Sequence, residues 1–310
     1  MRRLVVVSSL SALLASAAAL AAKPKPPPPP PNCNPQIAYV DQSASSGVYT
    51  VSNADGTCVS QLYSSSNKNV TGGMKFTPTG NQIIFTENNS IKLLTYEVAP
   101  TKVSTTSITT VSTEPLQPLY VDMSPDGTHL LIVEKNTDAP TLNHYNLYVL
   151  SMIDGTRTLV ADDQYNDAVW AHSNSRIAAI KGVDNGGLQT IEVYDLDANY
   201  QIETANTRVV FNSTVSQMNY LLRLESAHTS DTLLFNATSA GAVNVYTVDI
   251  VSNALTSVVA GWNASFNADD SAILFDGPTV ANLYTLDLTT HMQTQITNAN
   301  KVNATRPDFR

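Results

Sequence analysis

The feature that most constrains the fold is a two-strand unit that repeats along the chain from Gln36 to Arg310. Each copy has a short apolar strand, a loop, and a second strand reading aliphatic-Tyr-x-aliphatic-Asp or a close variant. The central position of this second strand recurs with a mean spacing of 47 residues between the first and last copies. It is occupied in turn by Tyr49, Lys92, Tyr148, Glu192, Tyr246 and Tyr284. A period of about 40 to 50 residues in a β-rich sequence indicates four-stranded propeller blades.

The preceding apolar strands and the turns agree with this period. These strands are expected at Ile37 to Val40, Ile83 to Phe85, Leu130 to Val133, Ile177 to Ile180, Leu233 to Phe235 and Ile273 to Phe275. Apolar runs with little alternation are typical of strands that are buried on both faces. Asp126-Gly127 should join the first two strands of a blade, whereas Asp55-Gly56 and Asp154-Gly155 should follow a third strand. No amphipathic helical pattern is sustained, so we predict an all-β, six-bladed β-propeller of four-stranded antiparallel blades.

The two ends of the repeat region predict how the ring closes. The first copy begins at Ile37 without a preceding inner strand, and a segment from Ala304 to Phe309 follows the sixth copy. This C-terminal segment resembles the inner strand and turn that precede the other copies. We therefore predict that it completes the first blade, which leaves no unpaired strand at the closure.

The N-terminal segments are expected to direct export. Arg2 and Arg3 precede an apolar run that ends in a small-x-small pattern, which predicts a signal peptide over residues 1–22. An uncleaved membrane anchor is the alternative, but the run is rich in Ala and Ser. Residues 23–35 form a proline-rich arm expected to extend as a spacer, with a proline-groove ligand as the alternative. The propeller domain is assigned to residues 36–310, and the protein is expected to be periplasmic or secreted.

Cysteine content and charge limit the possible partners. Cys33 and Cys58 are the two cysteines, and an even number in an exported chain favours one disulfide. The net charge of −9 becomes −11 without Arg2 and Arg3, and such an acidic chain lacks the basic surface that nucleic-acid binding needs. We expect a monomeric propeller without nucleic-acid partner, cofactor or stable membrane span after cleavage.

One copy of the repeat carries a family resemblance. The stretch from Ser124 to Ile132, followed by Asn146 to Ser151, resembles the repeat of TolB-like β-propellers, and weaker copies replace its Ser-Pro-Asp-Gly turn. The resemblance covers the chain after residue 36 and implies a six-bladed propeller, an exported location and, for TolB itself, a scaffold between envelope proteins. TolB also carries an α/β domain ahead of its propeller, which a proline arm replaces here, so only the propeller class is transferred.

Motifs for catalysis and metal binding are weak. The sequence contains no G-x-S-x-G, H-E-x-x-H, phosphate-loop or C-x-x-C motif. The carboxylates of Asp195 and Asp197 superficially open a calcium loop, but Tyr200 stands where glycine is needed, so a hairpin turn is favoured. His172 and His228 occupy equivalent turn positions, and without a third ligand we interpret them as turn residues. The chain contains six Asn-x-Ser/Thr sequons, which we attribute to its Asn/Ser/Thr-rich composition: Asn69, Asn88, Asn212, Asn236, Asn263 and Asn303.

A ligand or partner site is expected at the central channel, because propellers present their inner strands and entry loops there. The candidate channel residues are Lys75, Asp122, Asp167, Arg223, Glu225, Asn263 and Arg306. Solvated or paired charges would explain the same residues without a site. Trp170 and Trp262 are expected at comparable inner-strand positions, as core wedges or rim anchors.

Three functions are compatible with these features. The first is a non-enzymatic exported scaffold that binds a protein or another envelope component across its channel face. The second is a propeller enzyme acting on polysaccharide as a lyase or hydrolase, which predicts convergent titratable groups with strongly perturbed pKa values at the channel mouth. The third is a sensor of a small ligand or calcium, which predicts ligand-dependent melting.

Overall fold

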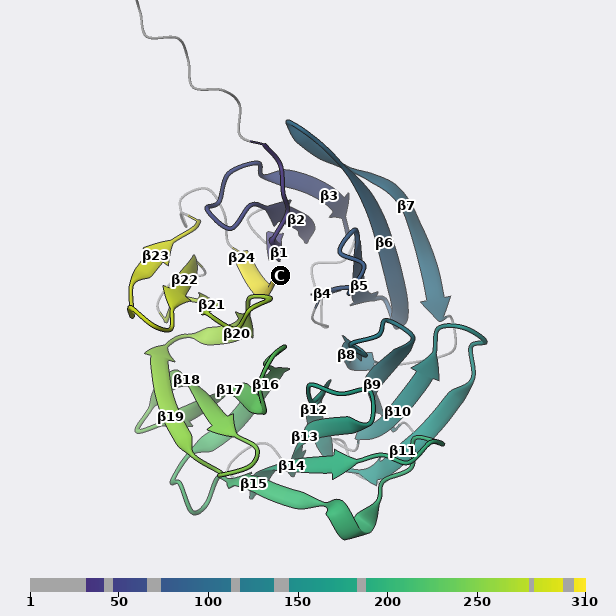
Figure 1. The fold of residues 1–310 in the computed structure, drawn as a ribbon, viewed down its shortest axis with the longest axis vertical. Coiled ribbons are helices and arrows are strands. Elements are labelled where there is room, and N and C mark those ends of the chain that lie inside the picture. Colours follow the sequence, from purple (N-terminus) through teal and green to yellow (C-terminus); the bar gives the residue numbers. More distant parts are fainter. Residues whose placement is uncertain are drawn as a thin grey trace, which may run out of the picture. The chain divides into compact units, whose positions relative to one another are not determined.

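The computed structural model describes residues 32–41, 47–65, 74–112, 118–136, 145–182, 188–278, 282–297 and 304–310. In these residues, twenty-four strands form six four-stranded antiparallel sheets arranged as blades around a central channel (Figure 1). One 3-10 turn, η1 (Thr204–Asn206), is the only helical element of the described part. The predicted six-bladed propeller is confirmed.

The blades run in chain order around the ring, each from an inner strand at the channel to an outer strand at the rim. Blade 1 comprises β24 (Ala304–Phe309), β1 (Ile37–Asp41), β2 (Val48–Ser52) and β3 (Ser60–Ser64). Blade 2 comprises β4 (Met74–Phe76), β5 (Gln82–Glu87), β6 (Ser90–Ala99) and β7 (Lys102–Ser112). Blade 3 comprises β8 (Pro118–Met123), β9 (His129–Lys135), β10 (Tyr145–Ser151) and β11 (Arg157–Asp163).

The remaining blades repeat this order of strands. Blade 4 comprises β12 (Tyr165–Trp170), β13 (Arg176–Gly182), β14 (Gln189–Asp195) and β15 (Arg208–Asn212). Blade 5 comprises β16 (Asn219–Ser226), β17 (Thr232–Ser239), β18 (Ala242–Asp249) and β19 (Leu255–Ala260). Blade 6 comprises β20 (Trp262–Phe266), β21 (Ala272–Asp276), β22 (Leu283–Asp287) and β23 (Gln293–Gln295).

Apolar contacts between neighbouring blades form the core. In β9, Leu130 to Val133 are each at most 1% exposed, as expected for a strand buried on both faces. Alternate residues of this strand face different neighbours: Leu130 and Ile132 pack with Ile84 of blade 2, whereas Leu131 and Val133 pack with blade 4. Each blade therefore depends on its two neighbours to bury its middle strands.

Tight turns follow the predicted chemistry. Gly127 between β8 and β9 and Gly155 between β10 and β11 have φ values of +73°, in the left-handed region that glycine adopts without steric cost. The aspartate before each glycine accepts the backbone N–H two residues ahead, with Asp126 Oδ1 and Asp154 Oδ1 both 2.9 Å from their donors. Such Asx turns satisfy a backbone donor while the chain reverses.

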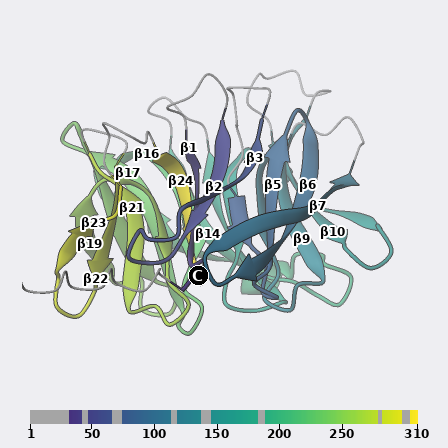
Figure 2. The same cartoon turned by 90° about the horizontal axis from the view of Figure 1, so that it is seen from above.

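The C-terminal strand closes the ring as predicted. Strand β24 pairs antiparallel with β1, with Phe309 opposite Ile37 and Asp308 opposite Ala38 (Figure 2). The Arg310 N–H also donates to the Gln36 carbonyl at 2.8 Å. Phe309 packs in an apolar cluster formed by blades 1 and 6, so the closure is made by both hydrogen bonds and packing.

Blade 1 is held by two further ties. The predicted disulfide joins Cys33 to Cys58, just before β3. The long β6–β7 hairpin packs against the same region: the Cys33 N–H donates to the Pro100 carbonyl at 3.0 Å, and the Thr105 hydroxyl donates to the Leu62 carbonyl at 2.7 Å. The start of the propeller is thus fastened to blade 2 as well as to the C-terminal strand.

The proposed signal peptide and most of the proline-rich arm lie outside the described residues. Within the described part, no helix is long and apolar enough to cross a membrane.

Deletion of residues 302–310 is expected to unfold the protein, so that no cooperative melting transition remains. The deletion removes β24, exposes the edge of β1 and uncovers the apolar cluster around Ile37. Thermal unfolding followed by circular dichroism would check this, and a truncated chain that melts like the full chain would show that β24 is dispensable.

A smaller change serves as control for that deletion. Phe309→Ala should lower the free energy of unfolding by about 3–5 kcal/mol, because it removes a buried aromatic side chain. Phe309→Leu should cost clearly less, since it keeps most of the apolar volume.

Candidate functional site

The inner strands place one repeated position at the channel, the residue just before the last residue of each strand. Its six occupants pair with equivalent positions of the second strands. They are Asp308 in blade 1, Lys75, Asp122, Val169, Glu225 and, in blade 6, Ser265. We call this set the channel ring. Four of its six members are ionisable, which is a high density of charge for the inside of a propeller.

Several ring side chains fasten one blade to the next. Asp308 Oδ2 accepts the Phe76 N–H of blade 2 at 2.6 Å, and Asp122 Oδ2 accepts the Trp170 N–H of blade 4 at 2.8 Å. The Ser265 hydroxyl accepts the Phe309 N–H at 3.2 Å. Inner strands are sheet edges whose outward N–H groups lack ladder partners, so these side chains supply the missing acceptors.

Two further side-chain acceptors join successive blades in the same way. Asp167 Oδ2 accepts the Leu224 N–H at 2.9 Å, and Asn236 Oδ1 accepts the Asn263 N–H at 2.9 Å. Both bonds join a blade to its successor in the ring. The polar residues of the channel therefore have a structural role before any role in binding.

Lys75 and Glu225 make an ion pair across the channel. They belong to blades 2 and 5, which lie opposite each other in the ring (Figure 1). Their side chains are only 10% and 11% exposed. Asp308 Oδ1 lies 3.6 Å from the same Lys75 Nζ. This pair spans the channel at the level of the ring.

Burial and mutual repulsion perturb the ring carboxyls. Burial raises the pKa of Asp122 to about 7, although Lys75 opposes the shift. Burial also raises the pKa of Asp308, again against the attraction of Lys75. For Lys75, burial alone would lower the pKa, but the nearby carboxylates of Glu225, Asp308 and Asp122 raise it above its ordinary value. The lysine is therefore held in its charged form.

Asp167 and Arg223 form an adjacent charged group. Burial raises the pKa of Asp167 to about 6, and Arg223 acts in the opposite direction. The Arg223 guanidinium lies 5.8 Å from the centroid of the Tyr120 ring. Arg223 itself has a φ of +51°, within a strand whose pairing with β17 is interrupted by register shifts. This irregular backbone accompanies the placement of Arg223 near Asp167 and Tyr120.

A cavity of about 390 Å³ opens above the channel ring at one mouth of the propeller. Its floor includes Lys75, Asp122, Glu225 and Asp308, and its lining includes Trp170. The turns after the inner strands contribute Pro78, Pro125, His172, His228 and Ala268, and the chain end contributes Arg310. Every blade supplies at least one lining residue. The volume falls within the range of about 300–1,000 Å³ that is usual for ligand sites.

The two histidines of the mouth are turn residues, as interpreted from the sequence. The His228 backbone N–H donates to Asp270 Oδ1 at 2.8 Å, and its ring Nδ1 lies 3.2 Å from the same oxygen. His172 has a φ of +51° in the turn after β12. Among the described residues, no group of three or more His, Cys, Asp or Glu side chains is arranged to hold a metal ion.

The structure brings together five of the seven predicted channel residues. Lys75, Asp122 and Glu225 line the cavity floor, and Asp167 and Arg223 lie in the adjacent group. Asn263 lies on β20 two residues before the ring member Ser265, as Arg223 lies two residues before Glu225, and its amide donates to Asp276 Oδ2 at 2.7 Å. The side chain of Arg306 lies outside the described residues.

Asp308 is the channel residue that the sequence prediction missed. The signal was present, because Asp308-Phe309 aligns with Lys75-Phe76 and Asp122-Met123 in the repeat. Ring closure predicts only that the segment from Ala304 to Phe309 is an inner strand, and it assigns no role to the side chains of that strand.

The expectation for the two tryptophans is wrong. Trp170 is the last residue of β12, is 3% exposed and lines the cavity. Trp262 is the first residue of β20 and is 37% exposed. They occupy opposite ends of their inner strands, so the two positions are not comparable.

The structure also bears on the weaker motifs. Asp195 accepts the Arg176 Nε–H at 2.7 Å, and Asp197 Oδ1 accepts the backbone N–H groups of Asn199 and Gln201 at 2.8 Å. This is the favoured hairpin turn. Of the sequons, Asn236 is 1% exposed, so its side chain is inaccessible to modification in the folded state. Asn69 and Asn303 lie outside the described residues.

The raised carboxyl pKa values predict a pH dependence of stability. In the folded protein, Asp122 has a pKa of about 7 and Asp167 about 6, whereas an unfolded aspartate titrates at about 3.9. The folded state therefore binds more protons between about pH 4 and 7, and these groups lower stability as the pH rises through that window. The free energy of unfolding of Asp122→Asn should therefore rise relative to that of wild type as the pH increases from about 4 to 7. Urea unfolding at several pH values would measure this difference.

Asp154→Asn provides a control of opposite sign. Backbone and side-chain hydrogen bonds, first that from the Thr156 N–H, lower the pKa of Asp154, so its contribution is present above the unfolded pKa and disappears as the pH falls through the folded one. If Asp122→Asn shows no pH-dependent difference from wild type, the assigned protonation of the floor is wrong.

Comparisons with known proteins support the fold. No protein-family model matches the sequence, and no curated protein matches it. The fold is similar to TolB from Acinetobacter baumannii, with a TM-score of 0.69 and 13% identity over 90% of this chain and 67% of the other. It is similar to a structure of the nidogen/laminin complex, with a TM-score of 0.65 and 9% identity over 89% of this chain and 98% of the other.

An oligogalacturonate lyase in complex with manganese is also similar, with a TM-score of 0.50 and 12% identity over 81% of this chain and 71% of the other. At such low identity these likenesses concern the fold alone. The described chain thus has the six-bladed propeller fold seen in TolB, and the resemblance carried by its repeats is confirmed for the propeller.

Proposed function

We propose that this chain is an exported, non-catalytic binding module that recognises a segment of another exported protein at its channel mouth. The observation that carries the proposal is the cavity of about 390 Å³ to which all six blades contribute. A site assembled from every blade is held by the whole ring, so its shape is set before a partner arrives. Such preorganisation lowers the entropic cost of binding.

The form of the cavity supports recognition rather than transport. The Lys75–Glu225 pair joins opposite blades at the floor of the cavity, which makes the floor charged and buried. Pro78 and Pro125 stiffen two of the rim turns, and Trp170 gives the lining an aromatic surface. A partner residue that enters would meet an apolar wall and a charged floor, a combination that suits an anchor side chain at the centre of an interface.

The roles of the floor carboxylates favour binding over catalysis. Asp122 and Asp308 each accept a backbone N–H from the next blade, and Glu225 pairs with Lys75. Moving a proton through any of them would weaken a bond that joins two blades. Groups with this structural function are better suited to a fixed recognition surface.

The N-terminal segment and the disulfide support an exported location. The proposed signal peptide and the Cys33–Cys58 bridge are both typical of an oxidising compartment. The resemblance to TolB-like propellers supplies the analogy for an envelope scaffold, and a similar fold occurs in a structure of the nidogen/laminin complex.

Affinity capture tests the proposal. The mature chain from Lys23 onward would be immobilised and exposed to detergent-solubilised envelope extract, with captured proteins identified by mass spectrometry. We expect reproducible capture of one exported protein, and loss of capture by Ala268→Arg. Ala268 is exposed at the cavity rim, so an arginine there would obstruct the cavity without entering the core.

A matched control keeps the test specific. Ala254→Arg places the same side chain on an exposed outer turn of blade 5, outside the cavity, and should capture as well as wild type. Equal capture by both variants, or none by wild type, would remove the channel mouth as a protein-binding site.

One observation favours an enzyme as the second candidate. Asp122 has a pKa of about 7 and lines a cavity beside Lys75, which is the convergence of perturbed groups that a catalytic site requires. By fold analogy alone, the substrate to test is oligogalacturonate. If this candidate holds, wild type will release unsaturated oligosaccharides and Asp122→Asn will not. No product from wild type, with manganese or calcium added, would exclude this substrate.

A further inference from the structure

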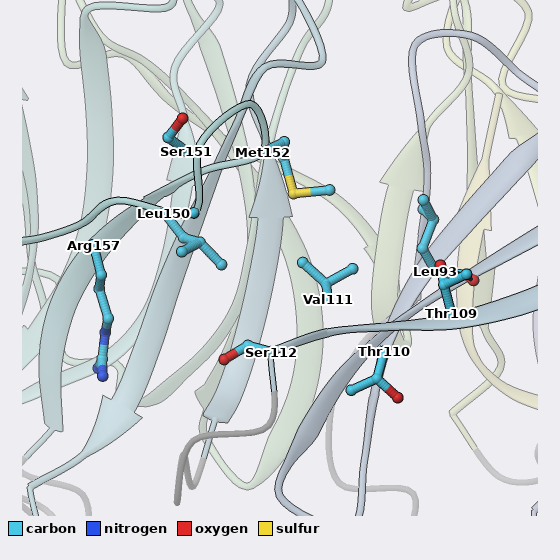
Figure 3. A pocket seen from close by; sticks show the side chains of 10 residues that line it. Leu93, Thr109, Thr110, Val111, Ser112, Leu150, Ser151, Met152 and Arg157 are labelled. Atoms are coloured by element: carbon cyan, nitrogen blue, oxygen red, sulfur yellow. Dashed lines mark hydrogen bonds between the residues drawn. The ribbon is translucent and has the colours of Figure 1, made fainter.

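A second cavity lies on the outer side of the ring, far along the blades from the channel floor. Its volume is about 340 Å³, and it separates β7 of blade 2 from the β10–β11 turn of blade 3. Leu150 and Met152 of blade 3 and Val111 of β7 point toward the same space (Figure 3). Leu93 continues the apolar wall on the blade 2 side. The cavity is thus the open outer margin of the core between the two blades.

The strand beside this cavity is an unusual sheet edge. With 11 residues, β7 is the longest described strand, whereas the other outer strands have between 3 and 7. Its first half packs against blade 1 through Val103 and Thr105. From Thr106 to Thr110 every residue is exposed, and Ser107 to Thr110 pair regularly with β6 between two register shifts. Among the described residues, no strand pairs with the outer edge of β7, so a regular free edge follows directly on the packed half.

This edge lacks the usual protection against strand addition. After Lys102, β7 contains no charged residue, proline or glycine, and it consists of Ser, Thr, Val and Ile. Outer strand β11 carries Arg157, Asp162 and Asp163, and β23 has only three residues. Charges, prolines and short length are the devices that normally block edge pairing. β-branched residues favour an extended pairing partner.

The charges around the cavity define what could pair there. Among its ten lining residues only Arg157 is charged. That guanidinium is already paired with Glu134 and stacked on the Tyr148 ring, 3.6 Å from its centroid. A charged incoming strand would lose solvation without finding a counter-charge, whereas an uncharged one would not.

We propose that the free half of β7 is a second recognition surface, which accepts an extended, uncharged and proline-free segment of a partner protein by strand addition. Main-chain hydrogen bonds to the Thr106–Thr110 edge hold the segment. One apolar side chain of leucine or methionine size enters the cavity between blades 2 and 3. Main-chain pairing provides affinity and the cavity provides selectivity, as in other cases of β-strand addition. This surface is separate from the channel mouth and does not depend on the function proposed there.

Selection from a library of random nine-residue peptides displayed on phage tests this proposal. The full mature protein would be immobilised, and enriched peptides would be synthesised for affinity measurement by fluorescence anisotropy. We expect enriched sequences to share at least five uncharged, proline-free residues with one Leu or Met. Their affinity should fall at least tenfold for Thr109→Lys, which places a charge on the free edge.

The control and the second variant separate binding from folding. Thr256→Lys puts the same charge on the exposed outer strand of blade 5 and should leave affinity unchanged. If Thr109→Lys melts well below wild type, Thr110→Lys replaces it, because Thr110 is also exposed and lines the cavity. A double-mutant cycle between Met152→Ala and an alanine at the apolar peptide position should show coupling, because both side chains meet in the cavity.

Three results would overturn the proposal. Enriched peptides that bind wild type and Thr109→Lys equally would place binding elsewhere, and a failure to enrich any peptide would remove the surface. Concentration-dependent dimerisation of wild type in sedimentation velocity, abolished by Thr109→Lys, would show that a second copy of this chain occupies the edge instead of a partner.

Discussion

The backbone amides of the inner strands are the constraint on which the rest of this propeller depends. Each inner strand pairs on one side only, and its other edge faces the channel, where an unpaired N–H would be costly. The preceding blade supplies side-chain acceptors to these groups, as Asp122 does for Trp170 and Asp308 does for Phe76. This requirement explains why polar residues enter a channel that apolar packing alone could have filled. It also makes each blade interface specific to its neighbours.

The same residues that join the blades also set the character of the site. Carboxylates placed to accept amides leave their other oxygens and their charge facing the channel, and one lysine cannot neutralise three of them. The result is a floor in which Lys75 is held charged while Asp122 and Asp308 have raised pKa values. Perturbed pKa values of this kind are found in catalytic sites, but here a structural cause accounts for them. The Lys75–Glu225 pair is costly to bury, so it is weak evidence for stability. It joins opposite blades across the channel.

Periodic features could be read from the sequence, whereas features that arise from three-dimensional convergence could not. The blade count, the Asp-Gly turns and the closure by the last strand follow from repeat spacing and local turn chemistry. The disulfide follows from the presence of two cysteines in a chain expected to be exported. Lys75, Asp122 and Glu225 were found because the repeat places them on inner strands. Their pairing could not be inferred, because it depends on blades 2 and 5 being opposite and on which rotamers cross the channel. The bond from Asn263 to Asp276 could not be inferred either, because it depends on the register shifts in β20.

The outer surface of blade 2 shows how a repeat can acquire a new feature without disturbing the ring. Strands β6 and β7 are longer than their counterparts in the other blades, and the additional length of β7 has two consequences. The hairpin packs against blade 1, where the Cys33 N–H donates to the Pro100 carbonyl and the Leu62 carbonyl accepts the Thr105 hydroxyl, and so reinforces the closure of the propeller. The second half of β7 runs toward blade 3, where no strand of the described part pairs with its outer edge. The elongated β6–β7 hairpin thus stabilises blade 1 with its first half. Its second half extends beyond what the blade interfaces bury and leaves a free edge beside blade 3.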